Sequence, residues 1–214
     1  KYPDQAKPLI HGHYSRGPTA ISLIDRIVAD EPARSATGEY VFGHVLFPHS
    51  PYNVDRDLEV RGVTTSFTDQ SIAAVRLMAR LIEKLKSEGR YKDTLIVFHG
   101  DHGLERSDKE FADADAPAGL FKSPRTLLLV KPSGTEKLPL KIALLQAQLV
   151  DVAPTLLSLI AKDKQPGLAG FSLISPDSVP QRDVQTFSYV RPVTREFRMM
   201  HFVRTDEGKW TKLP

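Results

Sequence analysis

Apolar residues recur at helical spacing most regularly between residues 68 and 89. Spaced three or four apart, they are Ile72, Val75, Met78, Ala79, Ile82 and Leu85. This periodicity predicts an amphipathic helix with one buried face. Thr68 or Asp69 is the expected N-cap, and Gly89 suits the position just after the last turn.

Shorter apolar runs rich in β-branched and aromatic residues predict strands. These runs cover residues 40–47, 94–98, 125–130 and 199–204. Two further helical patterns cover residues 18–28 and 151–160, and residues 209–214 are expected to form an exposed tail. Strands that alternate with helices in this way indicate a layered α/β domain with a mainly parallel sheet.

Composition narrows the class of protein. A chain of 214 residues with 41% hydrophobic content suits one globular domain, or one large fragment of a domain, covering 1–214. The net charge is only +3 and the basic residues are scattered, so nucleic acid is not an expected partner. The absence of cysteine excludes disulfides, thiolate metal ligands and a catalytic thiol. The chain begins at Lys1 without methionine and is interpreted as a piece of a longer protein.

No apolar run approaches the roughly 20 residues that a membrane-spanning helix needs. We therefore expect no membrane segment within these residues and a soluble chain.

The strongest candidate for chemistry is Asp101-His102-Gly103, which follows the apolar run that ends at His99 and Gly100. In α/β sheets, ligands bind at the carboxyl ends of strands. An oxygen ligand beside a nitrogen ligand suits a divalent cation such as zinc or manganese. Taken alone, the triplet also fits an ordinary turn.

Two further residues are candidates for contact with a substrate. His49 lies between Pro48 and Pro51, and a stiffened loop suits a side chain that must meet a substrate at a fixed angle. The alternative is that His49 only braces the turn. Lys122 precedes the predicted strand at 125–130 and is a candidate to meet an anionic substrate, although such lysines are often simply exposed.

Several segments, in order along the chain, resemble the sulfatase family of the alkaline phosphatase superfamily. They are Pro48-His49-Ser50-Pro51, the helix and strand that lead into Asp101-His102-Gly103, and the stretches 127–132, 149–157 and 170–173. The resemblance is strongest over residues 44–173. Gly100 stands where the family usually has serine. The resemblance implies an alkaline phosphatase-like α/β fold in which helices flank a mainly parallel sheet.

The resemblance also implies a metal-dependent reaction on a sulfate or phosphate ester, by a hydrolase or a phosphoryl-headgroup transferase. Asp101 and His102 then occupy the positions that bind a divalent cation, namely zinc, manganese or calcium. His49 maps to the histidine near the transferred group, and Lys122 is assigned to substrate binding. The alternative is a noncatalytic binding or regulatory domain that retains the fold.

Nothing in the chain resembles the N-terminal half of the family, which carries the nucleophile. The chain is therefore expected to be the C-terminal part of the catalytic domain and inactive alone, with the N-terminal half of the same protein as its partner. By resemblance, the full-length protein is expected to be membrane-anchored and to act outside the cytoplasm.

Overall fold

The computed structural model describes residues 16–29, 38–61, 65–103, 126–137, 139–143, 145–160, 167–174, 182, 184–191, 196–204 and 210–212. The chain divides into two compact units, Lys1–Tyr91 and Lys92–Pro214. Each unit is described by itself.

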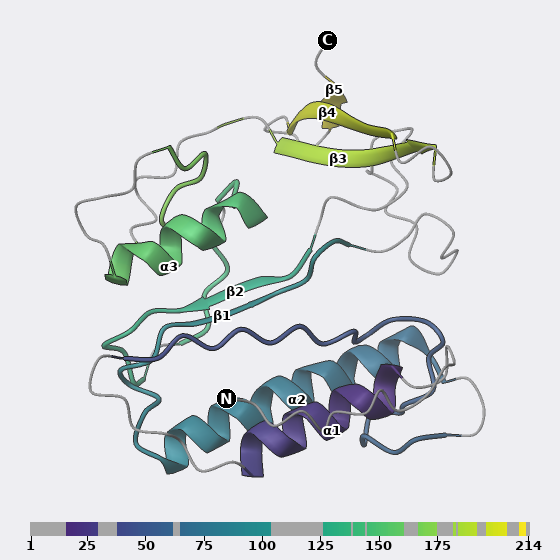
Figure 1. The fold of residues 1–214 in the computed structure, drawn as a ribbon, viewed down its shortest axis with the longest axis vertical. Helices are drawn as coiled ribbons and strands as arrows, with labels where there is room; N and C mark the ends of the chain where they lie inside the picture. The colour runs from purple at the N-terminus through teal and green to yellow at the C-terminus, as the bar shows by residue number, and fades with distance from the viewer. Residues whose placement is uncertain are drawn as a thin grey trace, which may run out of the picture. The chain divides into compact units, whose positions relative to one another are not determined.

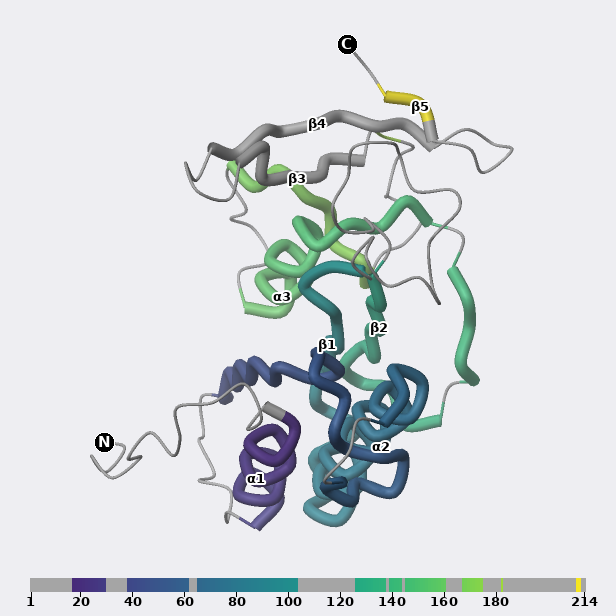
Figure 2. The backbone as a smooth tube through the Cα atoms, turned by 90° about the vertical axis from the view of Figure 1, so that its right-hand side faces the viewer, coloured from purple at the N-terminus to yellow at the C-terminus, as the bar shows by residue number. Residues whose placement is uncertain are grey.

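Two helices that lie side by side form the first unit (Figure 1, Figure 2). They are α1, Arg16–Ala29, and α2, Phe67–Ser87. Their core is built from Ala20 and Ile24 of α1 and Leu77 of α2. Val45 and Phe47, which precede the His49 loop, pack against this core. The loop is thus attached to the two helices by apolar contacts close to its start.

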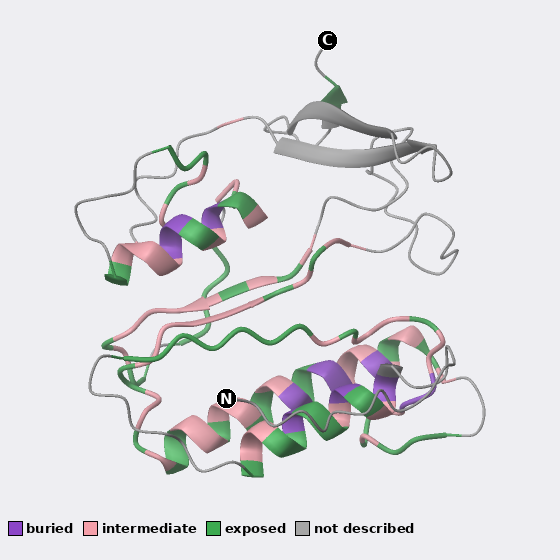
Figure 3. Cartoon of the chain, viewed as in Figure 1, coloured by how far each residue is buried: buried purple, intermediate pink, exposed green. Residues whose placement is uncertain are grey.

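The buried face of α2 is not the stripe that the apolar spacing predicted. Its buried residues are Gln70, Ala73, Ala74 and Leu77 (Figure 3). Val75, at the centre of the predicted stripe, is 58% exposed. Two adjacent alanines leave room for a second helix to approach the α2 backbone, and Ala73 is fully buried. The buried face of α2 thus combines two small residues with the larger side chains of Gln70 and Leu77.

The ends of α2 follow from side-chain capping. Ser66 is the N-cap, in place of the predicted Thr68 or Asp69. Its Oγ accepts from the Asp69 backbone N–H at 3.0 Å and donates to Asp69 Oδ2 at 2.9 Å. Hydrogen bonds from Arg56 and then Ser66 lower the pKa of the Asp69 carboxyl. Gly89, with a φ of +67°, follows the C-cap and occupies the position predicted for it.

Residues 40–47 were predicted to form a buried strand, and this prediction is wrong. Residues 40–46 lie within the described part of the chain but belong to no strand. Tyr40, Val41 and Phe42 are 63%, 67% and 70% exposed. Strand propensity alone does not make a strand, because the backbone N–H and C=O groups must pair with a neighbouring strand.

In the second unit, all pairs of described strands are antiparallel, which corrects the expected mainly parallel sheet. β1, Ile96–His99, pairs with β2, Leu128–Lys131. β3, Val184–Arg191, pairs with β4, Glu196–Arg204. The link from β3 to β4 is far shorter than the dozen or so residues that a parallel crossover requires.

The predicted C-terminal tail contains the last strand, β5, Trp210–Lys212, which pairs with β4. The exposed tail expected over residues 209–214 thus includes a short strand that was not predicted from the sequence. Thr211 and Lys212 are nevertheless exposed, as expected. An edge strand that ends in lysine is a common way to protect a sheet from further pairing.

A fully buried carboxylate organises the segment around α3, Val152–Ile160, which a 3₁₀ turn over Leu149–Asp151 precedes. Asp151 accepts hydrogen bonds from the backbone N–H groups of Gln148 and Phe171, at 2.8 and 2.9 Å. The Arg182 guanidinium also donates to this carboxylate. The charge is thus paired and hydrogen-bonded, as a buried charge must be.

A threonine one turn later completes the attachment of α3 to the following loop. Thr155 Oγ1 donates to the Asp151 carbonyl at 2.6 Å and accepts from the Leu173 N–H at 2.9 Å. Gly170 permits the close approach, because a Cβ there would lie 2.2 Å from the Val150 carbonyl oxygen. Asp151 and Thr155 are therefore structural residues.

Ser66→Ala should lower the free energy of unfolding by about 1 kcal/mol, the usual cost of losing an N-cap side chain. Thr68→Ala, at the N-cap that the sequence suggested, should change it by less than about 0.5 kcal/mol. Urea denaturation followed by far-ultraviolet circular dichroism measures both. Equal effects of the two substitutions would contradict the assignment of Ser66 as the cap.

Asp151→Ala should destabilise the second unit by about 3–5 kcal/mol, because it leaves the Arg182 charge without its buried partner. Asp101→Ala is the matched control in the same unit and should cost less than about 0.5 kcal/mol, since the Asp101 side chain is 68% exposed. Hydrogen exchange of the backbone amides of α3 measures the unfolding of this unit. A small loss in Asp151→Ala would show that the carboxylate does not hold the segment together.

Candidate functional site

Asp101 and His102 follow directly on β1, as the sequence predicted. The Gly100 N–H donates to the Leu127 carbonyl at 3.0 Å, which extends the pairing with β2 by one bond. A Cβ at Gly100 would lie 2.2 Å from Thr126 Oγ1. The threonine hydroxyl thus fills the space that a side chain at position 100 would need, and this explains why glycine precedes the Asp-His pair.

The start of β1 is held by Lys131, which lies opposite Ile96 in the ladder. Lys131 Nζ donates to the carbonyls of Lys92 and Thr94, at 2.9 and 3.0 Å. Burial lowers the pKa of this ammonium, against a smaller opposing effect of Asp93. Both ends of β1 are therefore tied to β2 or its flanks, and this fixes the strand from which the Asp-His pair projects.

The Asp101 carboxylate and the His102 ring face each other. Asp101 Oδ1 accepts from the His102 backbone N–H at 3.0 Å, and Asp101 Oδ2 lies 3.5 Å from His102 Nε2. His102 Nδ1 lies 2.7 Å from the Gly103 carbonyl, so Nδ1 carries the hydrogen of this bond. In the neutral ring, Nε2 then has the lone pair that binds metals.

The spacing of these two atoms fits a shared cation. Two ligands of a tetrahedral zinc, each about 2.0–2.2 Å from the metal, lie about 3.4 Å apart. The side chains are 68% and 29% exposed, so neither Asp101 nor His102 lies in the apolar core. Among the described residues there is no group of three or more potential ligands. The pair therefore supplies two ligands and requires others to complete a metal centre.

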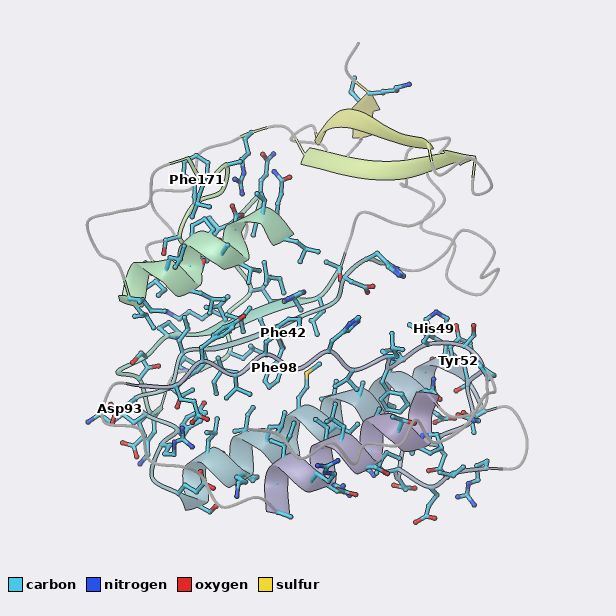
Figure 4. All side chains as sticks on the ribbon, in the orientation of Figure 1. Phe42, His49, Tyr52, Asp93, Phe98 and Phe171 are labelled. Atoms are coloured by element: carbon cyan, nitrogen blue, oxygen red, sulfur yellow. The ribbon has the colours of Figure 1, made fainter. Side chains whose placement is uncertain are left out.

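His49 belongs to the first unit, where Figure 4 shows it with Tyr52 beside the first turns of α2. Its Nδ1 lies 2.7 Å from the Ser50 carbonyl, which can only accept, so Nδ1 donates. The Tyr52 ring packs edge-on against Phe67 of α2, with 5.7 Å between ring centroids. The loop is thus held by contacts to the helix in addition to its two prolines.

Sequence reasoning missed Gln70, whose side-chain Nε2 donates to the His49 carbonyl at 2.8 Å. The signal in the sequence was the position of this polar residue on the helix. Ala73, Ala74 and Leu77 follow Gln70 by three, four and seven residues, so they lie on the same helix face. A polar residue on a buried helix face must find hydrogen-bond partners. The apolar stripe that includes Val75 was instead predicted to be the buried face.

The predicted site residues thus fall into three groups. Asp101 and His102 lie together in the second unit, and His49 lies on its anchored loop in the first unit. Lys122 lies outside the described residues. Within the described part of the chain, no helix is long and apolar enough to cross a membrane.

An Asp-His pair at the end of a strand presents one oxygen and one nitrogen donor, a combination that suits a divalent cation such as zinc or manganese. The family model described as Sulfatase matches residues 29–162, more than half of the chain. The chain therefore belongs to the sulfatase family. The matched range includes His49, Asp101 and His102. Comparisons with curated proteins and with solved structures gave no match.

Membership of this family indicates an alkaline phosphatase-like α/β fold and an ester hydrolase that acts on sulfate or phosphate esters. The three helices and small antiparallel sheets described here represent that fold in part. Enzymes of the family typically use divalent metals, which agrees with the donor atoms that Asp101 and His102 present.

Zn²⁺ should shift the ring signals of His102 in nuclear magnetic resonance spectra of the chain. Asp101→Ala should weaken this binding at least about tenfold, because one of two ligands is lost. His99→Ala is the matched control, since His99 is an exposed histidine close by on β1. It should leave the shift of His102 unchanged. Equal Zn²⁺ binding in Asp101→Ala and the unmodified chain would exclude a shared cation.

Proposed function

We propose that this chain is the C-terminal part of the catalytic domain of a metal-dependent sulfatase-like hydrolase or phosphoryl-headgroup transferase. The observation that carries the proposal is the 3.5 Å separation of Asp101 Oδ2 and His102 Nε2 after β1, inside the segment that matches the family. The matched range includes residues of both compact units, which supports the interpretation of residues 1–214 as one domain or one fragment of a domain.

In this proposal, Asp101 Oδ2 and His102 Nε2 hold the divalent cation. A mixed oxygen and nitrogen pair suits zinc or manganese better than calcium, which prefers oxygen ligands alone. When bound, the cation stabilises negative charge on the oxygens of the ester. The bond from Nδ1 to Gly103 orients the His102 ring, and Asp101 faces the ligating nitrogen.

His49 acts as the general acid in this proposal. Because Nδ1–H is engaged by the Ser50 carbonyl, the proton that moves is the one on Nε2. In its protonated state the ring donates this proton to the departing oxygen of the ester. Lys122 is the proposed countercharge for the nonbridging oxygens of the sulfate or phosphate group.

The nucleophile belongs, in this proposal, to an N-terminal half of the same protein, which also completes the ligand set. The isolated chain should then turn over neither aryl sulfates nor aryl phosphates appreciably, because loss of a nucleophile costs many orders of magnitude in rate. The proposed full-length enzyme is membrane-anchored and acts outside the cytoplasm.

The second candidate is a noncatalytic binding domain that retains the fold. It is favoured by the absence, among the described residues, of a cluster with three or more potential metal ligands. It predicts a full-length protein that binds anionic esters without turning them over.

In the full-length protein, His49→Ala should lower metal-dependent turnover of p-nitrophenyl sulfate or p-nitrophenyl phosphate by about 10²–10⁴-fold, the range for a positioned acid or base. The melting temperature should change little. His44→Ala is the matched control, because His44 is an exposed histidine in the same segment. Normal turnover in His49→Ala would refute its catalytic role, and turnover of neither ester by the unmodified protein would favour the binding domain.

A further inference from the structure

We propose that Gln70 is the positioning residue for His49, an inference that rests on the catalytic role proposed above. Gln70 lies in the first turns of α2 and is 1% exposed. Among the described residues, it has the largest fully buried side chain. A buried amide of this size destabilises a protein unless its donor and acceptor atoms have partners.

The amide of Gln70 connects both ends of the His49 loop. Its Nε2 donates to the His49 carbonyl at 2.8 Å. Its Oε1 accepts from the backbone N–H groups of Asn53 and Val54, at 3.0 and 3.1 Å. If the amide were rotated by half a turn, its NH₂ group would face the two backbone N–H groups and its oxygen would face the His49 carbonyl. The contacts therefore identify the nitrogen and the oxygen of the side chain.

These three bonds require a side chain that both donates and accepts at this length. A carboxylate accepts from the two N–H groups but has no hydrogen for the His49 carbonyl, and an apolar side chain does neither. Val54 is fully buried, and a Cβ on Gly17 of α1 would lie 2.5 Å from its Cγ2. The far end of the loop is thus packed against α1, while the bond from Gln70 links the His49 carbonyl directly to α2.

The position of the imidazole follows the backbone that Gln70 holds. The His49 ring is hydrogen-bonded through Nδ1 to the adjacent carbonyl of Ser50, so its orientation is set relative to the local backbone. A change in the position of the His49 carbonyl therefore moves the ring with it. Displacements of about 1 Å at a reacting group can cost about 10²-fold in rate.

Two substitutions separate the bonds. In Gln70→Met all three hydrogen bonds are lost, while in Gln70→Glu, measured at a pH at which the carboxyl is ionised, only the bond to the His49 carbonyl is lost. Ser71→Ala is the matched control, because the hydrogen bond that the Ser71 hydroxyl makes among the described residues stays within α2, to the Phe67 carbonyl at 2.8 Å. Ring signals of His49 and hydrogen exchange of the amides of residues 53 and 54 are measured on the chain by nuclear magnetic resonance.

We expect the His49 ring signals to shift in both Gln70 variants and to stay unchanged in Ser71→Ala. Exchange at residues 53 and 54 should accelerate about tenfold in Gln70→Met, as expected for the loss of one hydrogen bond each, and stay slow in Gln70→Glu. If Gln70→Glu fails to fold, Gln70→Met alone decides. Unchanged His49 signals in Gln70→Met would overturn the inference.

Turnover by the full-length protein separates this inference from the proposed function. Gln70→Met should lower kcat for the aryl ester by about 10–10²-fold and leave its KM within about twofold. If His49 moves in Gln70→Met but His49→Ala retains full turnover, the proposed catalytic role fails and so does positioning for catalysis. If His49→Ala is impaired but Gln70→Met has normal kcat, the function stands and the positioning role is wrong.

Discussion

A buried polar side chain is tolerated only when its hydrogen-bonding atoms have partners, and both units depend on this constraint. In the first unit, the Gln70 amide carries one donor and two acceptor contacts to a single loop. In the second, the Asp151 carboxylate accepts from two backbone N–H groups and from Arg182. In each case a helix residue fixes a segment that has no regular structure of its own, at 49–54 and at 170–173.

The same constraint determines which atoms remain available for chemistry. His49 and His102 each place Nδ1 within 2.7 Å of the carbonyl of the next residue. A carbonyl can only accept, so in both rings Nδ1 is the donor, and in the neutral ring the lone pair lies on Nε2. The local backbone thus selects the tautomer of two histidines that belong to different units.

Asp101 shows the opposite environment from Asp151. The Asp151 carboxylate is fully buried and fully occupied by structural bonds, whereas the Asp101 side chain is 68% exposed. Two aspartates in one unit therefore have different environments, and burial together with hydrogen-bond partners distinguishes them.

The sequence by itself determined the three helices, at 16–29, 67–87 and 152–160, to within a few residues. It also determined the strand before Asp101 and the position of Gly89 at the end of α2. These features depend on local periodicity and backbone preference. The sequence also indicated the family, because several short motifs that resemble those of the family follow one another in the correct order along the chain. Only the tertiary structure decided that Ser66 caps α2, that its buried face runs through Gln70, and that residues 40–46 stay unpaired. Strand pairing and burial depend on neighbours distant in sequence, and a periodic pattern contains no information about which neighbours those are.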